Sequence, residues 1–289
     1  MIILLGHTGF IGKEAYKLIE SKGLKVVGIS SKEIDFLDRN SCFKLLPLLD
    51  DETTLIITIA INRELGDSVE TLEQNIQMVS NIARALTQKK IKKCVYLSTA
   101  DVYGHPNEVI TENTVIDPKT YYAISKFSCE KILEIAANQS RVPLLILRYN
   151  GVWGPGQRNI GYGLNFFIST IIKEGRVHLW GKGEELRDAL FVKDLSRIIV
   201  DITLSKSRGI FNIARGTSIS FADMAKSLRK VSPKKFKVYY KKRTDPGFNQ
   251  RFNIRKLKKT LPKAHFTPLE IALKETINLA FKQDTKTWH

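Results

Sequence analysis

The stretch Gly6-His7-Thr8-Gly9-Phe10-Ile11-Gly12 decides the fold, because it joins an apolar run at residues 2–5 to an amphipathic segment at residues 10–22. The periodicity of the two flanking segments predicts a strand and then a helix. Glycines spaced three apart at such a junction permit a tight turn, close approach of the backbone to a phosphate and close packing of helix on strand. The stretch therefore predicts a dinucleotide site with the pyrophosphate at the helix start, formed by Gly6, Thr8, Gly9, Phe10, Ile11 and Gly12.

Strand and helix patterns continue to alternate up to residue 147. Strands are expected at residues 25–29, 54–61, 94–97 and 143–147, and helices at residues 41–46, 69–86 and 121–137. This alternation predicts an α/β fold of the Rossmann type, a doubly wound parallel sheet with helices on both faces. We assign residues 1–150 to this NAD(P)-binding domain.

A Gly- and Pro-rich loop at residues 151–163 ends the regular alternation. Beyond it, helices are expected at residues 166–173, 193–204, 221–230 and 269–281, with short strands at residues 177–180, 210–213 and 236–240. Residues 151–289 are therefore expected to form mainly a small carboxy-terminal α/β substrate lobe, with the chain crossing back to the sheet.

Composition places the chain among globular proteins. Its 289 residues are 43% hydrophobic and 26% charged, which excludes a disordered tail, a collagen-like repeat and a small disulfide scaffold. Mean hydropathy is −0.15, and neither a secretory leader nor an apolar run long enough for a bilayer is expected. Cys42, Cys94 and Cys129 are widely spaced, and the histidines show no ligand spacing, so we expect a cytoplasmic protein without a metal site.

The positive charge is concentrated in one segment. Net charge is +17, and residues 226–263 hold fifteen Lys and Arg against one acid, Asp245, a local charge of +14. Such a segment is typical of a protein with an anionic partner, whether phosphates on a small molecule, nucleic acid or a membrane face. A solvated lysine-rich surface explains it equally well at this stage.

The end of the second predicted strand bears on the choice of cofactor. A carboxylate there would bind the adenosine ribose and repel a 2′-phosphate, but the chain has Ser30-Ser31-Lys32. Hydroxyls and a cation favour NADP over NAD. Asp35 and Phe36, which follow directly, are candidates for the adenine pocket.

A tyrosine and a lysine four residues apart, Tyr122 and Lys126, share one face of a predicted helix. An ammonium beside a phenol is expected to lower the phenol pKa toward neutrality, so that Tyr122 can exchange a proton with a sugar hydroxyl while hydride moves at carbon. Thr99, at the carboxyl end of a predicted strand, is placed to hold the reacting oxygen together with Tyr122.

These pieces resemble an extended short-chain dehydrogenase/reductase of the nucleotide-sugar epimerase/dehydratase family, over nearly the whole chain. The matching motifs are Gly6-x-x-Gly9-x-x-Gly12, Ser98-Thr99-x-x-Val102-Tyr103-Gly104, Tyr122-x-x-x-Lys126, Arg148 with Gly154-Pro155-Gly156, and Arg187-Asp188-x-x-x-Val192-x-Asp194.

The resemblance implies a role for each matching position. Tyr122 is then the catalytic acid/base, Lys126 its partner and ribose ligand, and Thr99 the catalytic hydroxyl. Arg187 resembles the family's clamp on the sugar-nucleotide diphosphate, and Arg243 resembles a second arginine of that clamp. The expected substrate-binding residues are therefore Thr99, Asp101, Tyr122, Asn150, Arg187 and Arg243, and Ala60 is expected to lie near the cofactor.

The chain departs from the family pattern at three places. Ala100-Asp101 replaces the Asp-Glu pair of the dehydratases, which disfavours 4,6-dehydration. Ala60-Ile61 replaces the usual Ala-Ala. Gly151 stands where an asparagine is expected, beside Asn150.

The sequence therefore predicts an NAD(P)-dependent nucleotide-sugar oxidoreductase that transfers hydride at a ring carbon, C4, of a nucleoside-diphosphate hexose. The NADP preference favours a 4-ketoreductase, and a 4-epimerase is the alternative. A non-catalytic nucleotide-sensing or RNA-binding protein on the same fold is the alternative from another class. As an enzyme, the chain is expected to be a cytoplasmic homodimer in polysaccharide biosynthesis, with a nucleotide-sugar rather than a membrane or nucleic acid as its partner.

Overall fold

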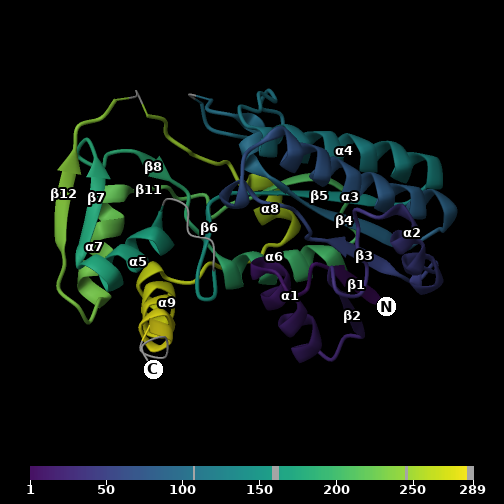
Figure 1. Ribbon diagram of the computed structural model, residues 1–289, viewed down its shortest axis with the longest axis horizontal. Coiled ribbons are helices and arrows are strands. Elements are labelled where there is room, and N and C mark those ends of the chain that lie inside the picture. The colour runs from purple at the N-terminus through teal and green to yellow at the C-terminus, as the bar shows by residue number, and fades with distance from the viewer. Residues whose placement is uncertain (107, 158–162, 245–246, 285–289) are drawn as a thin grey trace.

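The computed structural model describes residues 1–106, 108–157, 163–244 and 247–284. Residues 158–162 of the predicted surface loop, Asp245 of the basic segment and the last residues of the chain lie outside this description. The described chain forms a sheet flanked by helices, with a smaller lobe beside it (Figure 1).

The main sheet has six parallel strands in the order β10-β5-β4-β3-β1-β2. Their bounds are β1 Ile2–Leu5, β2 Val26–Ile29, β3 Thr54–Ile57, β4 Lys93–Thr99, β5 Leu144–Tyr149 and β10 Gly209–Ile213. The order reverses beside β1, where a doubly wound sheet opens its ligand crevice. The Rossmann-type fold predicted from the alternating pattern is confirmed.

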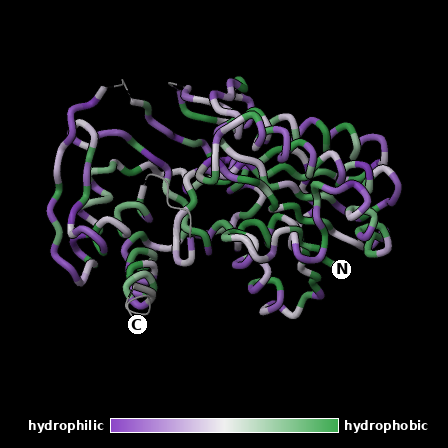
Figure 2. Tube along the Cα trace, viewed as in Figure 1, coloured by the Kyte–Doolittle hydropathy of each residue, from purple (hydrophilic) through white to green (hydrophobic). Residues whose placement is uncertain are grey.

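Helices cover both faces of the sheet. Helices α1 (Phe10–Ser21) and α6 (Val192–Leu204) pack on one face, and α3 (Val69–Gln88) and α4 (Tyr121–Ser140) pack on the other. The strands between them are largely buried and apolar, as Figure 2 shows for the centre of the molecule. Because α6 and β10 belong to this layer, the chain crosses back to the sheet after residue 151.

The smaller lobe has an apolar core of its own. Its elements are α5 Leu164–Glu174, β7 Arg176–Trp180, β8 Leu186–Arg187, β11 Ile219–Ser220, α7 Phe221–Val231, β12 Lys237–Lys241 and α9 Leu269–Asp284. The short pair β6 (Val152–Trp153) and β9 (Leu190–Phe191) links the lobe to the sheet, and α8 (Arg255–Thr260) returns to β10.

Two predicted elements differ from the structure. The helix expected at residues 41–46 is a single turn, α2 (Arg39–Cys42), followed by the 3-10 helix η1 (Phe43–Leu48), which contains Pro47. The third strand ends at Ile57 and not at residue 61, because the chain leaves the sheet there. Asn75 of α3 then holds Ile61, since its side chain accepts from the Ile61 N–H (2.8 Å) and donates to its carbonyl (2.9 Å).

A buried ion pair ties the strands beneath the crevice. Arg148 of β5 donates from Nε (3.0 Å) and Nη2 (2.6 Å) to the carboxylate of Glu130 on α4, and both side chains are almost fully buried. Ser98 of β4 also donates to Glu130. Arg148 donates in turn to the Tyr103 hydroxyl (2.9 Å), which donates to Asn212 of β10 (2.8 Å). The network fixes α4 relative to three neighbouring strands.

We expect Glu130→Gln to lower the free energy of unfolding by about 3 kcal/mol, because Arg148 would then be a buried charge without a counter-ion. Urea denaturation followed by circular dichroism measures this. Glu134→Gln is the matched control, since Glu134 lies one turn later on α4 in an exposed pair with Lys131 and should change stability by less than about 0.5 kcal/mol. Equal effects of the two substitutions would contradict the structural role of the Glu130–Arg148 pair.

Candidate active site

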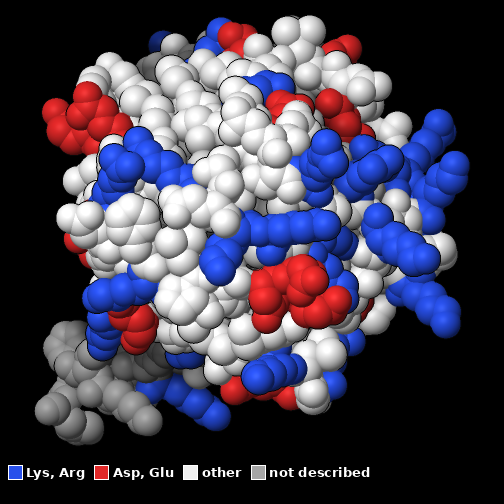
Figure 3. Space-filling view, turned by 90° about the vertical axis from the view of Figure 1, so that its right-hand side faces the viewer, with Lys and Arg blue, Asp and Glu red and all other residues white. Residues whose placement is uncertain are grey.

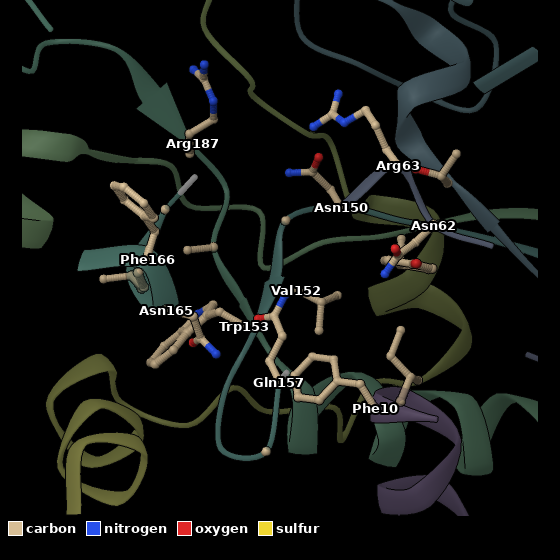
Figure 4. A pocket seen from close by; sticks show the side chains of 18 of the residues that line it. Phe10, Asn62, Arg63, Asn150, Val152, Trp153, Gln157, Asn165, Phe166 and Arg187 are labelled. Atoms are coloured by element: carbon tan, nitrogen blue, oxygen red, sulfur yellow. The ribbon is translucent and has the colours of Figure 1, made fainter. Parts of the chain in front are cut away.

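A cavity of about 1420 Å³ opens where the carboxyl ends of the strands face the lobe. Residues from the glycine turn, the ends of β4 and β5, and the lobe all line it. Figure 4 shows Asn62, Arg63 and Asn150 on the sheet side and Arg187, Asn165 and Phe166 on the lobe side. The cavity is therefore shared between the two parts of the chain.

The glycine turn leaves its backbone open toward this cavity. Gly6 has φ +90°, and a Cβ on Gly12 would lie 2.1 Å from the Gly6 carbonyl oxygen, so no larger residue fits at Gly12. No described side chain caps the start of α1, where Gly9 is the N-cap. The first N–H groups of the helix are thus available to an anion. Thr8, Gly9, Phe10, Ile11 and Gly12 all line the cavity, an arrangement that fits a dinucleotide pyrophosphate.

The tip of β2 carries a carboxylate that the sequence reasoning missed. The Glu33 side chain accepts hydrogen bonds from the N–H (2.7 Å) and the hydroxyl (2.6 Å) of Ser30. These hydrogen bonds lower the pKa of Glu33, which therefore keeps its negative charge. The signal was present in Ser30-Ser31-Lys32-Glu33, since Ser-x-x-Glu is a capping-box pattern.

The other residues predicted for the adenosine end lie outside the described cavity lining. Ser31 and Lys32 are exposed beside Ser30. Asp35 is exposed and accepts from the Leu37 N–H (2.9 Å). Phe36, predicted with Asp35 for the adenine pocket, is 3% exposed and packs in the core. Ala60 does line the cavity, three residues after the end of β3.

Thr99 and Tyr122 both line the cavity. Thr99 is the last residue of β4, and its hydroxyl accepts from the Asp101 N–H (3.1 Å) at the start of the 3-10 helix η3 (Ala100–Tyr103). Tyr122 is the second residue of α4. The Asp67 side chain helps to cap the N-terminus of this helix, because it accepts a hydrogen bond from the Tyr122 N–H (2.9 Å). Both side chains are more than nine-tenths buried and line the cavity.

Lys126 lies behind this wall. It is 2% exposed, its Nζ donates to the Leu97 carbonyl (2.6 Å), and it lies 4.1 Å from the centre of the Tyr96 ring. Burial lowers the pKa of Lys126 to about 8. The ammonium is therefore held by a strand carbonyl and a ring face.

The expectation of a lowered tyrosine pKa is wrong for this structure. Burial raises the pKa of Tyr122 well above its ordinary value, and a hydrogen bond with Tyr149 together with the charge of Asp101 raises it further. The Arg63 charge lowers it only in part. Tyr149, at the end of β5, also lines the cavity and was not predicted.

Asp101 and Arg63 face one another at the mouth of the site. Arg63 belongs to the 3-10 helix η2 (Arg63–Leu65), and its Nη1 lies 4.0 Å from Asp101 Oδ2. Figure 4 shows Arg63 extending into the cavity. Burial raises the pKa of Asp101, although the Arg63 charge opposes this. Arg63 comes from an irregular loop after β3, so no periodicity could have singled it out.

Asn150 and Gly151 form the floor of the cavity. Asn150 is 4% exposed and its amide donates to the Asp188 carbonyl (3.0 Å). Gly151 has φ +48°, and a Cβ there would lie 2.6 Å from the same carbonyl oxygen. An asparagine therefore cannot replace Gly151 without moving the Asp188 backbone, which explains this departure from the family pattern.

The two predicted clamp arginines have different positions. Arg187 lines the cavity, donates to the Phe248 carbonyl (2.6 Å) and stacks 4.2 Å from the centre of the Phe248 ring. Arg243 is not among the described cavity-lining residues. It pairs with Glu185 (2.8 Å), which also contacts Arg187 (3.3 Å). Arg243 is thus placed to support Arg187 through a shared carboxylate.

Two carboxylates near these arginines, Glu185 and Asp188, have shifted pKa values. Burial raises the pKa of Glu185, but hydrogen bonds from Arg243 and the Phe248 N–H, with the charge of Arg187, lower it overall to about 2. Asp188 accepts from the N–H groups of Arg215 and Gly216 (both 2.7 Å), and burial raises its pKa to about 6. The Asp188 carboxylate thus binds the backbone at Arg215 and Gly216.

The described part of the chain contains no candidate for a metal site or a membrane-spanning helix. There, three or more His, Cys, Asp or Glu side chains nowhere gather closely enough to hold a metal ion. None of the helices in the same residues has the length and apolar character needed to cross a bilayer.

Comparison with known proteins finds matches over most of the chain. Residues 2–214 match the family model described as the NAD dependent epimerase/dehydratase family. The chain is 24% identical over 257 residues to a Bacillus subtilis protein named as an uncharacterized UDP-glucose epimerase, covering 80% of each chain.

Solved structures show the same fold. UDP-glucose 4-epimerase of Thermotoga maritima with UDP-glucose aligns with a TM-score of 0.86 at 23% identity, over 98% of this chain and 99% of that one. UDP-glucose 4-epimerase of Thermus thermophilus in complex with NAD aligns with a TM-score of 0.83 at 20% identity, over 96% and 98%.

The buried lysine predicts a pH-dependent stability difference. In the unfolded chain Lys126 is protonated below its ordinary pKa of about 10.4, whereas in the folded protein it is protonated only below about 8. Burial of the ammonium therefore lowers the free energy of unfolding most below pH 8, and this loss fades as the pH rises from about 8 to about 10.4. We expect the Tm of Lys126→Met minus that of the parent protein to be several degrees higher at pH 7 than at pH 10.

Differential scanning fluorimetry across this range measures the difference, with Lys131→Met, an exposed lysine on the same helix, as the control. A Tm difference for Lys126→Met that stays constant between pH 7 and pH 10 would show that the lysine is not buried as described.

Proposed function

Because the chain belongs to the NAD-dependent epimerase/dehydratase family, we propose that it transfers hydride at C4 of a nucleoside-diphosphate hexose. The observation that carries this proposal is the meeting of Thr99, Tyr122 and the glycine turn at one cavity. Arg187 on the facing wall suits a diphosphate, since a guanidinium binds phosphate oxygens through two parallel hydrogen bonds.

The roles follow from these positions. Thr99 and Tyr122 hold the reacting sugar oxygen between two hydroxyls, and Tyr122 exchanges its proton. Bound NAD would accept a hydride from C4 and return it, and its oxidised ring would add a positive charge to the site. The N–H groups at the start of α1 would bind its pyrophosphate, and Lys126 would bind its ribose.

The raised pKa of Tyr122 has a consequence for the proton transfer. At neutral pH the phenol carries its proton, so the side chain is ready to protonate a keto oxygen. Removing a proton from a hydroxyl requires a nearby positive charge. Lys126 supplies one if its ammonium moves away from the Leu97 carbonyl.

Epimerisation at C4 is the outcome that we favour. The relatives described above are named as epimerases, and an epimerase returns the hydride without net use of cofactor. The 4-ketoreductase predicted from the sequence remains the second candidate. It rested on a preference for NADP, and that preference has no support from a family described as NAD dependent.

The carboxylate of Glu33 supports NAD as the cofactor. It carries a fixed negative charge beside Ser30, at the strand end where a 2′-phosphate of NADP would lie. Lys32 is exposed next to it and is the residue that favours NADP. We propose that the carboxylate outweighs the ammonium, because two hydrogen bonds hold it in place.

A non-catalytic role is less consistent with the site. Burial of a threonine, a tyrosine and a lysine beside one cavity lowers stability. A protein that only senses a nucleotide has no need of these three side chains there.

We also propose that the chain works as a homodimer in the cytoplasm. Val69 on α3 and Ile124 and Ile135 on α4 are exposed apolar side chains on the adjoining pair α3 and α4, which suits a four-helix contact between two copies. All three cysteines are free and buried, which suits a reducing compartment. A role in polysaccharide biosynthesis remains a prediction.

Tyr122→Phe is expected to lower kcat at least about 100-fold with little change in folding, because it removes only the proton-transferring hydroxyl. The assay uses UDP-glucose with NAD and detects UDP-galactose by chromatography. The same assay on a 4-keto sugar nucleotide with NADPH or NADH, followed at 340 nm, tests the ketoreductase.

Interconversion of two sugar nucleotides without net change in NADH establishes the epimerase, and stoichiometric oxidation of NADPH or NADH establishes the ketoreductase. Full activity of Tyr122→Phe would contradict the proton-transfer role of Tyr122, and absence of both activities in the parent protein would overturn the proposed function.

Glu33→Gln is expected to raise the affinity for NADP relative to NAD by about 10-fold, because it removes the charge that repels the 2′-phosphate. Isothermal titration with each dinucleotide measures both Kd values without turnover. Glu20→Gln on α1 is a control of equal charge change, at an exposed position away from the tip of β2. An unchanged NADP/NAD ratio in Glu33→Gln would contradict the proposed role of the carboxylate.

A further inference from the structure

The basic segment includes one strand, β12, at the outer side of the lobe. β12 pairs in parallel with β7, and it is the outermost element at the left of Figure 1, with α5 and α7 inside it. Val177, Leu179 and Val238 point inward and pack in the core of the lobe. Side chains alternate along a strand, so the residues between them face outward.

These outward residues form what we call the outer sheet face. It consists of Arg176, His178 and Trp180 from β7 and Lys237, Tyr239 and Lys241 from β12. Arg176, Lys237 and Lys241 are basic, the other three are aromatic, and none of the six is acidic. Of the six, only His178 is half-buried and the other five are exposed.

The register places the rings and cations of the two strands directly opposite one another. Tyr239 lies opposite His178, with ring centres 5.5 Å apart and planes inclined by 28°. Lys241 lies opposite Trp180, with its Nζ 5.6 Å from the ring centre. Lys237 lies opposite Arg176, and two like charges in this position are unfavourable. The face therefore combines ring surfaces with an excess of positive charge.

This positive charge is poorly compensated. Arg176 pairs with Glu174 (2.6 Å), but among the described residues no carboxylate lies within ion-pair distance of Lys237, Lys241 or the neighbouring Lys235 and Lys242. At the opposite end of the molecule, Figure 3 shows Lys and Arg side chains together with several clusters of Asp and Glu. An uncompensated basic surface attracts a polyanion.

We propose that the outer sheet face binds single-stranded nucleic acid. Unpaired bases stack on exposed aromatic rings, and cations between the rings bind the phosphates that link those bases. Tyr239 and Trp180 remain 46% and 41% exposed, so each offers a ring surface while being held in place by its neighbour. This proposal departs from the expectation that nucleic acid is not a partner, and it does not depend on the sugar-nucleotide chemistry.

Two other polyanions fit less well. A membrane surface requires apolar side chains that insert between lipids, whereas Trp180 and Tyr239 are each more than half covered as whole residues. A nucleic acid duplex keeps its bases stacked inside and presents phosphates alone, so it leaves the aromatic rings without a role. Single strands use both features of the face.

Fluorescence anisotropy of a labelled 12-nucleotide single-stranded RNA, titrated with the full-length protein, tests the proposal. We expect salt-dependent binding with a slope of log Kobs against log[salt] near −2, as about three cations would give. Tyr239→Ala and Trp180→Ala should each weaken binding by about 10-fold, within the range that loss of one base–ring stack causes.

The matched control separates this face from general charge. Lys237→Gln/Lys241→Gln should weaken binding at least about 5-fold, whereas Lys258→Gln/Lys259→Gln, an equal charge change on exposed residues of α8, should change it less than 2-fold. Tyr122→Phe should leave RNA binding unchanged, and the face variants should keep the Tm and the dinucleotide affinity of the parent protein.

Equal losses from the two lysine pairs, binding of a matched duplex as tight as that of the single strand, or retention by phosphatidylglycerol vesicles without RNA binding would each overturn the proposal. None of these outcomes affects the proposed sugar-nucleotide activity, which the turnover assays test separately.

Discussion

The site depends on the buried ion pair between Glu130 and Arg148. Glu130 belongs to α4, the helix that carries Tyr122 and Lys126, and Arg148 belongs to β5, the strand that ends at Tyr149, directly before Asn150. Ser98 joins the same carboxylate immediately before Thr99. One pair of charges thus sets the relative positions of helix and strand ends, because a buried pair tolerates little change in geometry.

Local sequence patterns were sufficient for the fold and for part of the site. The glycine turn, the Tyr122–Lys126 spacing and the threonine at a strand end are signals within single elements, and the family resemblance drawn from them is confirmed by the family model. The parallel sheet is also confirmed, since alternating strands and helices leave few other arrangements.

What the sequence did not reveal depends on contacts between distant segments. Arg63 reaches Asp101 from an irregular loop, and the need for glycine at residue 151 comes from the backbone of Asp188. The raised tyrosine pKa follows from burial, and burial is set by the packing of α4 against β4 and the cavity wall. Glu33 is different, because its Ser-x-x-Glu pattern was visible and only its structural context gives it meaning.

Hydride transfer at C4 in the cavity between sheet and lobe is tested most directly with UDP-glucose that carries deuterium at C4. After incubation with the protein and NAD, chromatography should separate UDP-glucose from its C4 epimer, and NMR should find the deuterium retained at C4 of both. Absence of the epimer, or loss of the deuterium to water, would contradict the central claim, because a group removed as hydride and returned does not exchange with solvent.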